Sequence, residues 1–244
     1  MGIVVSGHEG FIGSYLMEHL PPDTVGLDIK SGNDILNCPL PEADTVIHLA
    51  AEPGVIASME DPCKNAQTNI LGTIRLANHY KDSKFIFASS GGTIQETIES
   101  PYGLSKKTCE EYIKLLMRHW VILRFPNVYG EGSRSVVDKF LNQDRNIVYG
   151  DGGQTRTYGH VSDVVRGVVK ALDWPEQQTY KFGGKQNYTV KEIGEAIGRP
   201  LTYLMTRPGE LAYSRLDNIT PDWETTVELM DYIKDAKNGK TDRN

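Results

Sequence analysis

Short apolar runs alternate with longer amphipathic stretches through the first half of the chain. β-Branched and aromatic residues dominate the short runs, which predicts buried strands, and apolar positions at helical spacing between them predict helices. The strands are expected at 3–5, 24–27, 45–49, 84–88 and 120–125, and the helices at about 11–20, 61–81 and 102–119. This alternation indicates an α/β fold in which helices cover a doubly wound parallel sheet.

The pattern changes after about Pro126, where helices become shorter and the loops richer in glycine. Thr189-Val190-Lys191-Glu192 is typical of a capping box, and it predicts a helix that ends at Gly198. A last helix is predicted from about Glu224 to Lys237. The second half therefore differs in texture from the first and is expected to form a smaller lobe.

Length and composition agree with this division. The chain has 244 residues, of which 39% are hydrophobic and 24% charged, as in globular proteins. We expect a sheet domain over residues 1–125 and a C-terminal lobe over 126–244, with about 158–183 returning to the sheet. The formal net charge of −6 argues against a nucleic-acid-binding surface. No apolar run approaches the ~18–20 residues needed to span a bilayer.

Cysteine and histidine usage limits the chemistry further. Cys38, Cys63 and Cys109 are scattered and lack Cys-x-x-Cys spacing, which favours free thiols in a reducing compartment. The six histidines show no ligand spacing, so no catalytic metal is predicted. The expectation is a cytoplasmic protein without a membrane segment.

A glycine-rich turn follows the first predicted strand, with glycines at positions 7, 10 and 13. Such glycines allow a tight turn, a close approach of backbone to a pyrophosphate, and close packing of the next helix on the strand. The second predicted strand ends in Asp28, whose carboxylate can accept hydrogen bonds from an adenosine ribose and repel a 2′-phosphate. The pattern favours NAD over NADP, although Asp28 could also be an ordinary turn residue.

Tyr102 and Lys106 are four residues apart, so they lie on one face of a helix. A lysine charge favours the phenolate, and a bound nicotinamide cation would favour it further. Lowering the phenol pKa from ~10 to about 7 would give a base suited to taking a proton from an alcohol while its hydride leaves. The spacing alone could also arise by chance on a solvated helix face.

The ordered set of motifs resembles the extended short-chain dehydrogenase/reductase family, in particular its nucleotide-sugar epimerases and dehydratases. Besides the glycine turn and the Tyr102/Lys106 pair, the resemblance includes 48–51, 53–62, 69–73, Ser89-Ser90, 124–130 and 207–210. It implies a Rossmann-like sheet that binds NAD and a smaller C-terminal lobe that binds the substrate.

The resemblance also implies roles for individual residues. NAD would contact three groups: Gly7, Gly10, Phe11, Ile12 and Gly13 at the pyrophosphate, Asp28, Asp34 and Ile35 at the adenosine, and Leu49, Ala50 and Ala51 nearby. Tyr102 would be the base, with Lys106 as its electrostatic partner and as a ligand of the nicotinamide ribose, so both residues would also contact the cofactor. The active hydroxyl would be Ser90, with Ser89 and Thr93 as alternatives. In the lobe, Asn127 would contact the substrate, Arg156 and Arg207 its diphosphate, and Ser214 would leave room for a 2-substituent.

Departures from the family pattern bear on the reaction. The chain is shorter than typical members, and Gln95-Glu96 replaces the usual tyrosine-glycine after the serine motif. Gly91 and Gly92 occupy the positions at which the dehydratases of the family share an Asp-Glu pair. The glutamate of the decarboxylating members and the cysteine of the 3,5-epimerases are also missing from this segment.

What remains is the minimal set for oxidation at C4. It suits a 4-epimerase acting on a UDP-hexose or a UDP-N-acetylhexosamine. A nucleotide-sugar 4-keto reductase or dehydrogenase and a non-catalytic NAD- or nucleotide-sugar-binding sensor stay open as alternatives. The resemblance further implies a homodimer formed through the helices around 61–81 and 102–119.

Overall fold

The computed structural model describes residues 2–94, 98–184, 186–207, 209, 212–218 and 220–239. The chain divides into two compact units. Unit 1 comprises Met1–Arg124 and Val165–Tyr180, and unit 2 comprises Phe125–Val164 and Lys181–Asn244. The polypeptide therefore passes from one unit to the other three times.

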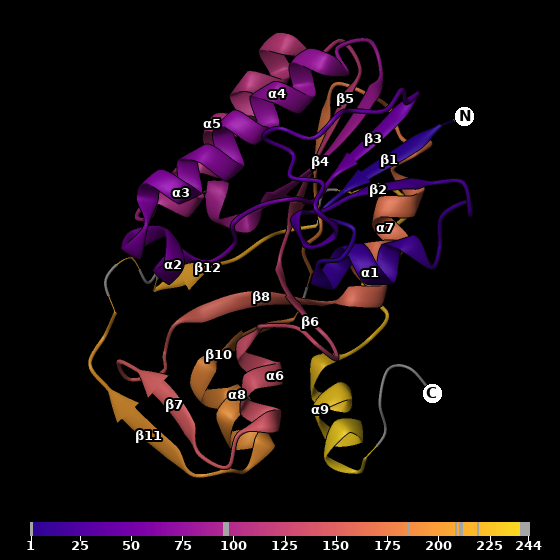
Figure 1. Cartoon of the computed structure of the whole chain (residues 1–244). Coiled ribbons are helices and arrows are strands. Elements are labelled where there is room, and N and C mark those ends of the chain that lie inside the picture. Colours follow the sequence, from indigo (N-terminus) through magenta and orange to yellow (C-terminus); the bar gives the residue numbers. More distant parts are fainter. Residues whose placement is uncertain are drawn as a thin grey trace. The chain divides into compact units, whose positions relative to one another are not determined.

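Unit 1 is built on a six-stranded sheet with the order β2-β1-β3-β4-β5-β9 (Figure 1). Adjacent strands β2, β1, β3 and β4 pair in parallel, with Val4 opposite both Val25 and Val46. The strands are β1 (Ile3–Ser6), β2 (Val25–Leu27), β3 (Thr45–His48), β4 (Lys84–Ser90), β5 (Trp120–Phe125) and β9 (Gln178–Lys181). The prediction of an α/β fold with a parallel, Rossmann-like sheet is confirmed.

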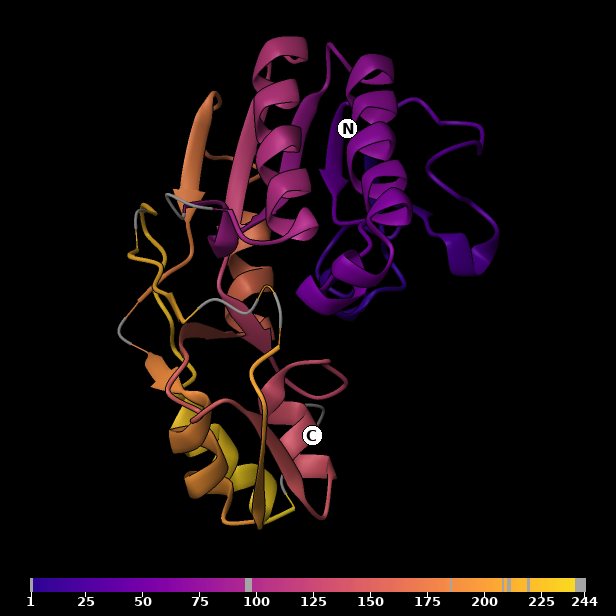
Figure 2. The ribbon, with the colours of Figure 1, turned by 90° about the vertical axis from the view of Figure 1, so that its left-hand side faces the viewer.

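Helices lie on both faces of this sheet, as a doubly wound arrangement requires. In Figure 1, α1 and α7 cover one face and α3, α4 and α5 the other, and Figure 2 shows α4 and α5 side by side. The helices are α1 (Phe11–Met17), α2 (Val55–Glu60), α3 (Pro62–Ala66), α4 (Gly72–His79), α5 (Pro101–Leu116) and α7 (Val161–Lys170). Short 3-10 turns form η1 (Ile29–Ser31) and η3 (Gly91–Ile94).

The helix predicted over 61–81 is interrupted by one π turn. Between α3 and α4, residues Gln67–Leu71 (η2) follow π-helical hydrogen bonding, and the helical path continues on either side. A single π turn inside a helix frees backbone carbonyls for other partners. Here the Asn69 carbonyl accepts hydrogen bonds from Thr73 Oγ1 at 2.6 Å and Cys109 Sγ at 3.2 Å.

The core of unit 1 packs the central strands against α4 and α5. The sheet contributes the buried side chains of Phe85, Phe87 and Ile122 to this core, and the helices contribute Leu76 and Ile113. The sheet ends at β2, because residues 28–44 contain only the short turn η1 and no further strand. The carboxyl ends of the parallel strands thus carry the glycine turn after β1, Asp28 after β2 and residues 49–51 after β3.

The described residues of unit 2 form two small sheets and three helices. β8 (Thr155–His160) pairs antiparallel with β10 (Asn187–Thr189) and in parallel with β12 (Tyr213–Ser214) and β6 (Asn127–Tyr129). β7 (Asn146–Tyr149) and β11 (Leu201–Leu204) form a separate parallel pair. The helices are α6 (Val136–Asn142), α8 (Val190–Ile197) and α9 (Leu229–Lys237), which share an apolar core with Tyr129 and Tyr158.

The capping box predicted at 189–192 is present. Thr189 Oγ1 accepts from the Glu192 N–H at 3.1 Å, and the Glu192 carboxylate accepts from the Thr189 N–H at 2.7 Å. Gly198 ends the helix with a φ of 77°, a conformation that glycine adopts without strain.

The last helix begins later than predicted, at Leu229 rather than about Glu224. The residues in front of it are held by a buried side chain instead. Asp163 accepts hydrogen bonds from the Thr226 N–H at 2.8 Å and the Val227 N–H at 3.1 Å. This long-range contact replaces the first helical turn, and sequence periodicity carries no signal for it.

Candidate active site

The glycine turn is packed so closely that side chains would not fit. A Cβ at Gly7, whose φ is +77°, would lie 2.6 Å from the Ala50 nitrogen. A Cβ at Gly13 would lie 2.2 Å from the Gly7 carbonyl oxygen, and one at Gly10 3.1 Å from the same oxygen. The turn that leads to Phe11 and Ile12 at the start of α1 is therefore packed against Leu49 and Ala50 after β3.

Asp28 joins the glycine turn to the end of β2. Its Oδ2 accepts from the Glu9 N–H and its Oδ1 from the Lys30 N–H, each at 3.0 Å. The carboxylate is thus held beside the turn, and each oxygen keeps lone pairs for a further donor. Asp28 also caps the turn η1, so both of the predicted roles, turn residue and polar acceptor, are compatible with its position.

Asp34 and Ile35 lie near Asp28 in the same loop, since the Asn33 N–H donates to the Asp28 carbonyl at 2.8 Å. Asp34 Oδ1 accepts from the Leu36 N–H at 2.9 Å. Arg75 of α4 donates to the Ile35 carbonyl at 2.6 Å, which ties this loop to the helix. The loop is therefore fixed at both of its ends.

A buried histidine that the sequence reasoning gave no role links β1, β3 and α4. His48 Nδ1 lies 2.6 Å from Ser6 Oγ, and His48 Nε2 lies 2.9 Å from Thr73 Oγ1. Because Thr73 donates its single proton to the Asn69 carbonyl, Nε2 must carry the ring proton and Nδ1 must accept from Ser6. Burial, with the Lys106 charge as a smaller cause, lowers the pKa of His48 to about 3. His48 is therefore neutral at physiological pH.

Lys106 is almost fully buried on α5. Its Nζ donates to the Ala88 carbonyl at 2.7 Å and lies 4.7 Å from the centre of the Phe87 ring. Burial lowers the pKa of Lys106 to about 8. The ammonium therefore lies at the carboxyl end of β4, with a proton that it can lose at moderately alkaline pH.

Tyr102 lies one turn before Lys106 on the same helix and pairs with a serine. Burial raises the pKa of the Tyr102 phenol, and hydrogen bonding with Ser90 opposes this rise. The direction is opposite to the predicted lowering by Lys106, because desolvation outweighs the effects of the neighbouring side chains. The Tyr102 N–H donates to Ser58 Oγ of α2 at 3.1 Å, a contact that the sequence reasoning missed.

Of the three hydroxyls proposed from sequence, those of Ser89 and Thr93 share Glu110 as a partner, and that of Ser90 does not. Ser89 Oγ donates to Glu110 Oε1 at 2.6 Å. Thr93 Oγ1 lies 2.8 Å from the Ser90 carbonyl and 3.2 Å from Glu110 Oε1. Ser90 Oγ accepts from the Gly92 N–H at 3.2 Å and also bonds with Tyr102. Of the three side chains, Ser90 is the one paired with Tyr102, whereas Gln95 and Glu96 lie outside the described residues.

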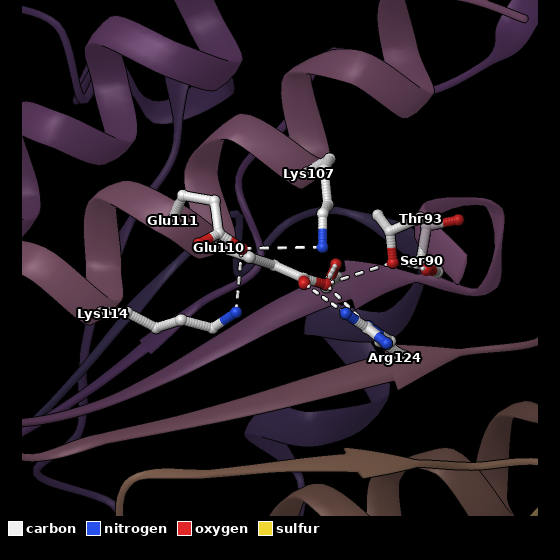
Figure 3. Close-up of polar contacts among 8 residues, drawn as sticks. Ser90, Thr93, Lys107, Glu110, Glu111, Lys114 and Arg124 are labelled. Atoms are coloured by element: carbon white, nitrogen blue, oxygen red, sulfur yellow. Dashed lines mark hydrogen bonds and ion pairs between the residues drawn. The ribbon is translucent and has the colours of Figure 1, made fainter. Parts of the chain in front are cut away.

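Glu110 and Arg124 form a buried ion pair below this loop (Figure 3). Burial would raise the pKa of Glu110, but hydrogen bonds from Arg124, Ser89 and Thr93 hold it below its ordinary value. Sequence reasoning missed this pair, because Glu110 and Arg124 lie on different elements, α5 and β5, and their spacing gives no local pattern.

The substrate residues proposed from sequence all lie in unit 2. Arg156 of β8 stands opposite Ser214 of β12 in the strand register, so the structure brings these two together. Asn127, at the start of β6, donates to the Thr157 carbonyl at 3.3 Å. The Arg207 guanidinium lies 3.8 Å from the centre of the Tyr149 ring, a cation–π contact that was not predicted.

Two features are absent from the described part of the chain. No three His, Cys, Asp or Glu side chains there gather as the ligands of a metal ion would. Among the same residues, no helix has both the length and the apolar character needed to cross a membrane.

Comparison with known proteins places these features in context. A protein of Methanocaldococcus jannaschii is 31% identical over 303 residues, and the alignment covers 99% of both chains. The UDP-glucose 4-epimerase of Mycolicibacterium smegmatis is 29% identical over 302 residues, covering 96% of each. Both alignments are longer than this chain, so these relatives carry segments that it lacks, which agrees with the expectation of a chain shorter than typical family members.

Solved structures give the same result for the fold. The UDP-glucuronic acid 4-epimerase of Bacillus cereus, in complex with UDP-glucuronic acid and NAD, matches with a TM-score of 0.85. It is 26% identical, and the match covers 98% of each chain. The model of the NAD dependent epimerase/dehydratase family matches residues 3–183, and the chain belongs to that family.

Proposed function

We propose that this chain is an NAD-dependent epimerase that inverts C4 of a nucleotide sugar, a UDP-hexose or a UDP-N-acetylhexosamine, through a transient 4-keto sugar. The observation that carries the proposal is that Tyr102 and Lys106 lie one turn apart on α5, with the buried Lys106 Nζ hydrogen-bonded to the Ala88 carbonyl two residues before Ser90. Tyr102, Lys106 and Ser90 are the groups that removal and return of a hydroxyl proton requires.

The residues at the carboxyl ends of β1–β3 fit a dinucleotide. Glycines 7 and 13 occupy positions where a Cβ would meet main-chain atoms at less than 3 Å, and Asp28 presents a fixed carboxylate beside them. We propose that Gly7, Gly10, Phe11, Ile12 and Gly13 hold the pyrophosphate of NAD. Asp28, Asp34 and Ile35 would bind its adenosine, with Leu49, Ala50 and Ala51 beside them.

The chemistry that NAD supplies when bound is the reversible acceptance of a hydride. The protein must then manage the proton. In the proposed reaction the Tyr102 phenolate takes the proton of the sugar 4-hydroxyl, and Ser90 donates a hydrogen bond to the same oxygen. The Lys106 ammonium favours the phenolate by its charge. The 4-keto sugar then rotates while bound, and Tyr102 returns the proton after the hydride has been delivered to its opposite face.

The segment after Ser90 favours this reaction over those of other family members. Gly91 and Gly92 have no side chain that could act as the additional acid or base of a dehydratase or a decarboxylase. A 4-keto reductase would use the same Tyr102 and Lys106, but it would consume a cofactor in every turnover.

Substrate recognition is proposed for residues of unit 2. Arg156 and Arg207 would pair with the diphosphate, since guanidinium groups stay charged and bind phosphate oxygens bidentately. Asn127 would contact the sugar nucleotide. Ser214 is small, and we propose that it leaves room for an N-acetyl group at C2.

A homodimer is proposed through the exposed face of α5. Leu104, Tyr112 and Leu115 are 55%, 39% and 81% exposed, and their spacing places them on one face of this helix. Leu71, 56% exposed, adds an apolar side chain from the neighbouring helical segment. Such a row of exposed apolar side chains is typical of an interaction surface.

The first test is purification, followed by release and chromatography of any bound cofactor. UDP-GlcNAc and UDP-glucose would then each be supplied without added NAD. Bound NAD together with conversion to the 4-epimer is the expected result. Conversion that needs stoichiometric NADH would identify a reductase instead. Tight binding of NAD or UDP-sugar with no conversion would identify a sensor.

A further inference from the structure

Glu110 carries a fully buried carboxylate that has no role in the proposed reaction as described above. It lies on α5 four residues after Lys106 and eight after Tyr102, so the three side chains follow one another along one face of the helix. Figure 3 shows Glu110 directed toward the sheet, whereas its neighbour Glu111 is directed to Lys107 and Lys114.

Four hydrogen bonds converge on the Glu110 carboxylate. Arg124 of β5 donates from Nε to Oε1 at 2.9 Å and from Nη2 to Oε2 at 2.6 Å, a bidentate arrangement. Ser89 and Thr93 direct their hydroxyls to Oε1 at 2.6 and 3.2 Å. Because both hydroxyls are donors here, the carboxylate must remain ionised for the set to be complete.

Ser89 and Thr93 lie on either side of Ser90. Thr93 Oγ1 also contacts the Ser90 carbonyl at 2.8 Å, so its proton is shared between that oxygen and Glu110. The intervening residues are Gly91 and Gly92, whose backbones have wide conformational freedom. Ser90 is the last residue of β4, and the hydroxyls of Ser89 and Thr93 anchor the chain on both sides of it.

We propose that Glu110 and Arg124 are positioning residues for the reaction. Their ion pair anchors the 89–93 segment through the hydroxyls of Ser89 and Thr93, and this holds Ser90 Oγ against Tyr102. The role rests on the proposed function, since it concerns the hydroxyl that would bind the sugar oxygen.

A stabilising role alone accounts poorly for this arrangement. Replacing a buried ion pair by apolar side chains of similar volume is often neutral or stabilising, so such a pair is weak evidence for stability. Here two extra hydroxyl donors connect the pair to the segment that carries Ser90. Catalytic groups displaced by about 1 Å can lose about 100-fold in rate, so anchoring of this kind has a kinetic effect.

The sharpest test removes the connection and keeps the ion pair. The double variant Ser89→Ala/Thr93→Val leaves Glu110 and Arg124 in place. We expect its kcat for the UDP-sugar to fall about 10- to 100-fold, with KM and bound NAD nearly unchanged. Thr93→Ser, which keeps the hydroxyl, should retain activity. Glu111→Gln is the matched control, because it removes a carboxylate of the same helix that is 54% exposed and forms ion pairs with Lys107 and Lys114.

A double-mutant cycle with Glu110→Gln separates positioning from general stability. If Glu110 acts through the two hydroxyls, adding Glu110→Gln to the double variant should decrease kcat by a further factor of less than about two. The proposal would be overturned if the kcat losses of Glu110→Gln and of the Ser89→Ala/Thr93→Val variant multiply when the changes are combined. It would also be overturned if the Ser89→Ala/Thr93→Val variant has the kcat of wild type. If Glu110→Gln does not fold, the hydroxyl variants carry the test by themselves. Wild-type protein that shows no turnover would instead refute the proposed function, and with it the positioning role.

Discussion

At the scale of single residues, Tyr102 combines an unfavourable environment with an essential proposed task. Its pKa is raised by burial, so the phenolate has to be favoured by charges close to it. Lys106 can supply such a charge only below its own pKa of about 8. Burial thus raises the pKa of the proposed base, Tyr102, and lowers the pKa of its partner, Lys106.

Replacing Tyr102 by Phe removes the phenolic oxygen and keeps the ring. We expect kcat for the 4-epimerisation to fall by about 10²- to 10⁴-fold, because proton transfer loses its base. Bound NAD, measured after release by ultraviolet absorbance, should stay at the wild-type level. Turnover within about tenfold of wild type would mean that another group removes the proton.

His48 gives a second prediction at this scale, for stability. The pKa of His48 is about 3 in the folded protein and 6.5 ordinarily, so only the unfolded chain gains this proton as the pH falls below 6.5. The contribution of His48 to the free energy of unfolding is therefore fully present above pH 6.5 and is lost as the pH falls below that value. Between pH 7 and pH 5, this one group should lower the free energy of unfolding by about 2 kcal/mol.

The comparison for this prediction is His48→Gln, which cannot take up a proton. Urea unfolding at both pH values should show a smaller loss for the variant, by about the amount given by the histidine. Equal losses for the two proteins would show that His48 is protonated in the folded state.

At the scale of elements, the glycine turn and the start of α1 act as one piece. Gly13→Ala would place a Cβ 2.2 Å from the Gly7 carbonyl and 2.7 Å from the His8 Cα, both main-chain atoms that cannot turn aside. The turn must then move, and we expect the purified variant to have lost its bound NAD. The ratio of absorbance at 260 and 280 nm measures this loss.

Gly2→Ala is the matched control for the glycine turn. Its Cβ would lie 3.7 Å from the nearest atom, an ordinary contact, so NAD content should be that of wild type. Retention of NAD by Gly13→Ala would exclude the close packing of this turn as a requirement for binding.

Also at the scale of elements, the sequence predicts the strands of unit 1 better than those of unit 2. The five strands predicted in unit 1 are present. Four of them, β1, β3, β4 and β5, are largely buried, and buried parallel strands can be recognised as continuous apolar runs. The sheets of unit 2 were not predicted strand by strand, since β6, β10 and β12 have only two or three residues each. Such short strands form through their neighbours, and periodicity cannot identify them.

For the candidate site, local motifs were informative and long-range contacts were not. The glycine turn, Tyr102 and Lys106 are recognisable because their spacing is short. Glu110 and Ser58 were missed, because their partners come from distant parts of the chain. The direction of the Tyr102 pKa shift was also missed, since it depends on burial that only the folded chain provides.

At the scale of the whole molecule, the proposed homodimer depends on the apolar face of α5. Leu115→Ser removes the most exposed leucine of that face, and we expect the measured mass to fall from that of a dimer to that of a monomer. Size-exclusion chromatography with light scattering gives the mass directly. Leu204→Ser is the control, because Leu204 is also exposed but lies on β11 of unit 2. A dimer that survives Leu115→Ser would have to use another surface.

The repeated passage of the chain between its two units has a consequence during synthesis. The sheet of unit 1 is complete only when β9 joins β5, yet most of the first half of unit 2 lies between these strands in sequence. A ribosome adds about 5–20 residues per second, so the edge of β5 stays unpaired for several seconds after it emerges. Exposed strand edges are sites of aggregation, so this interval is where nascent chains would most need a chaperone.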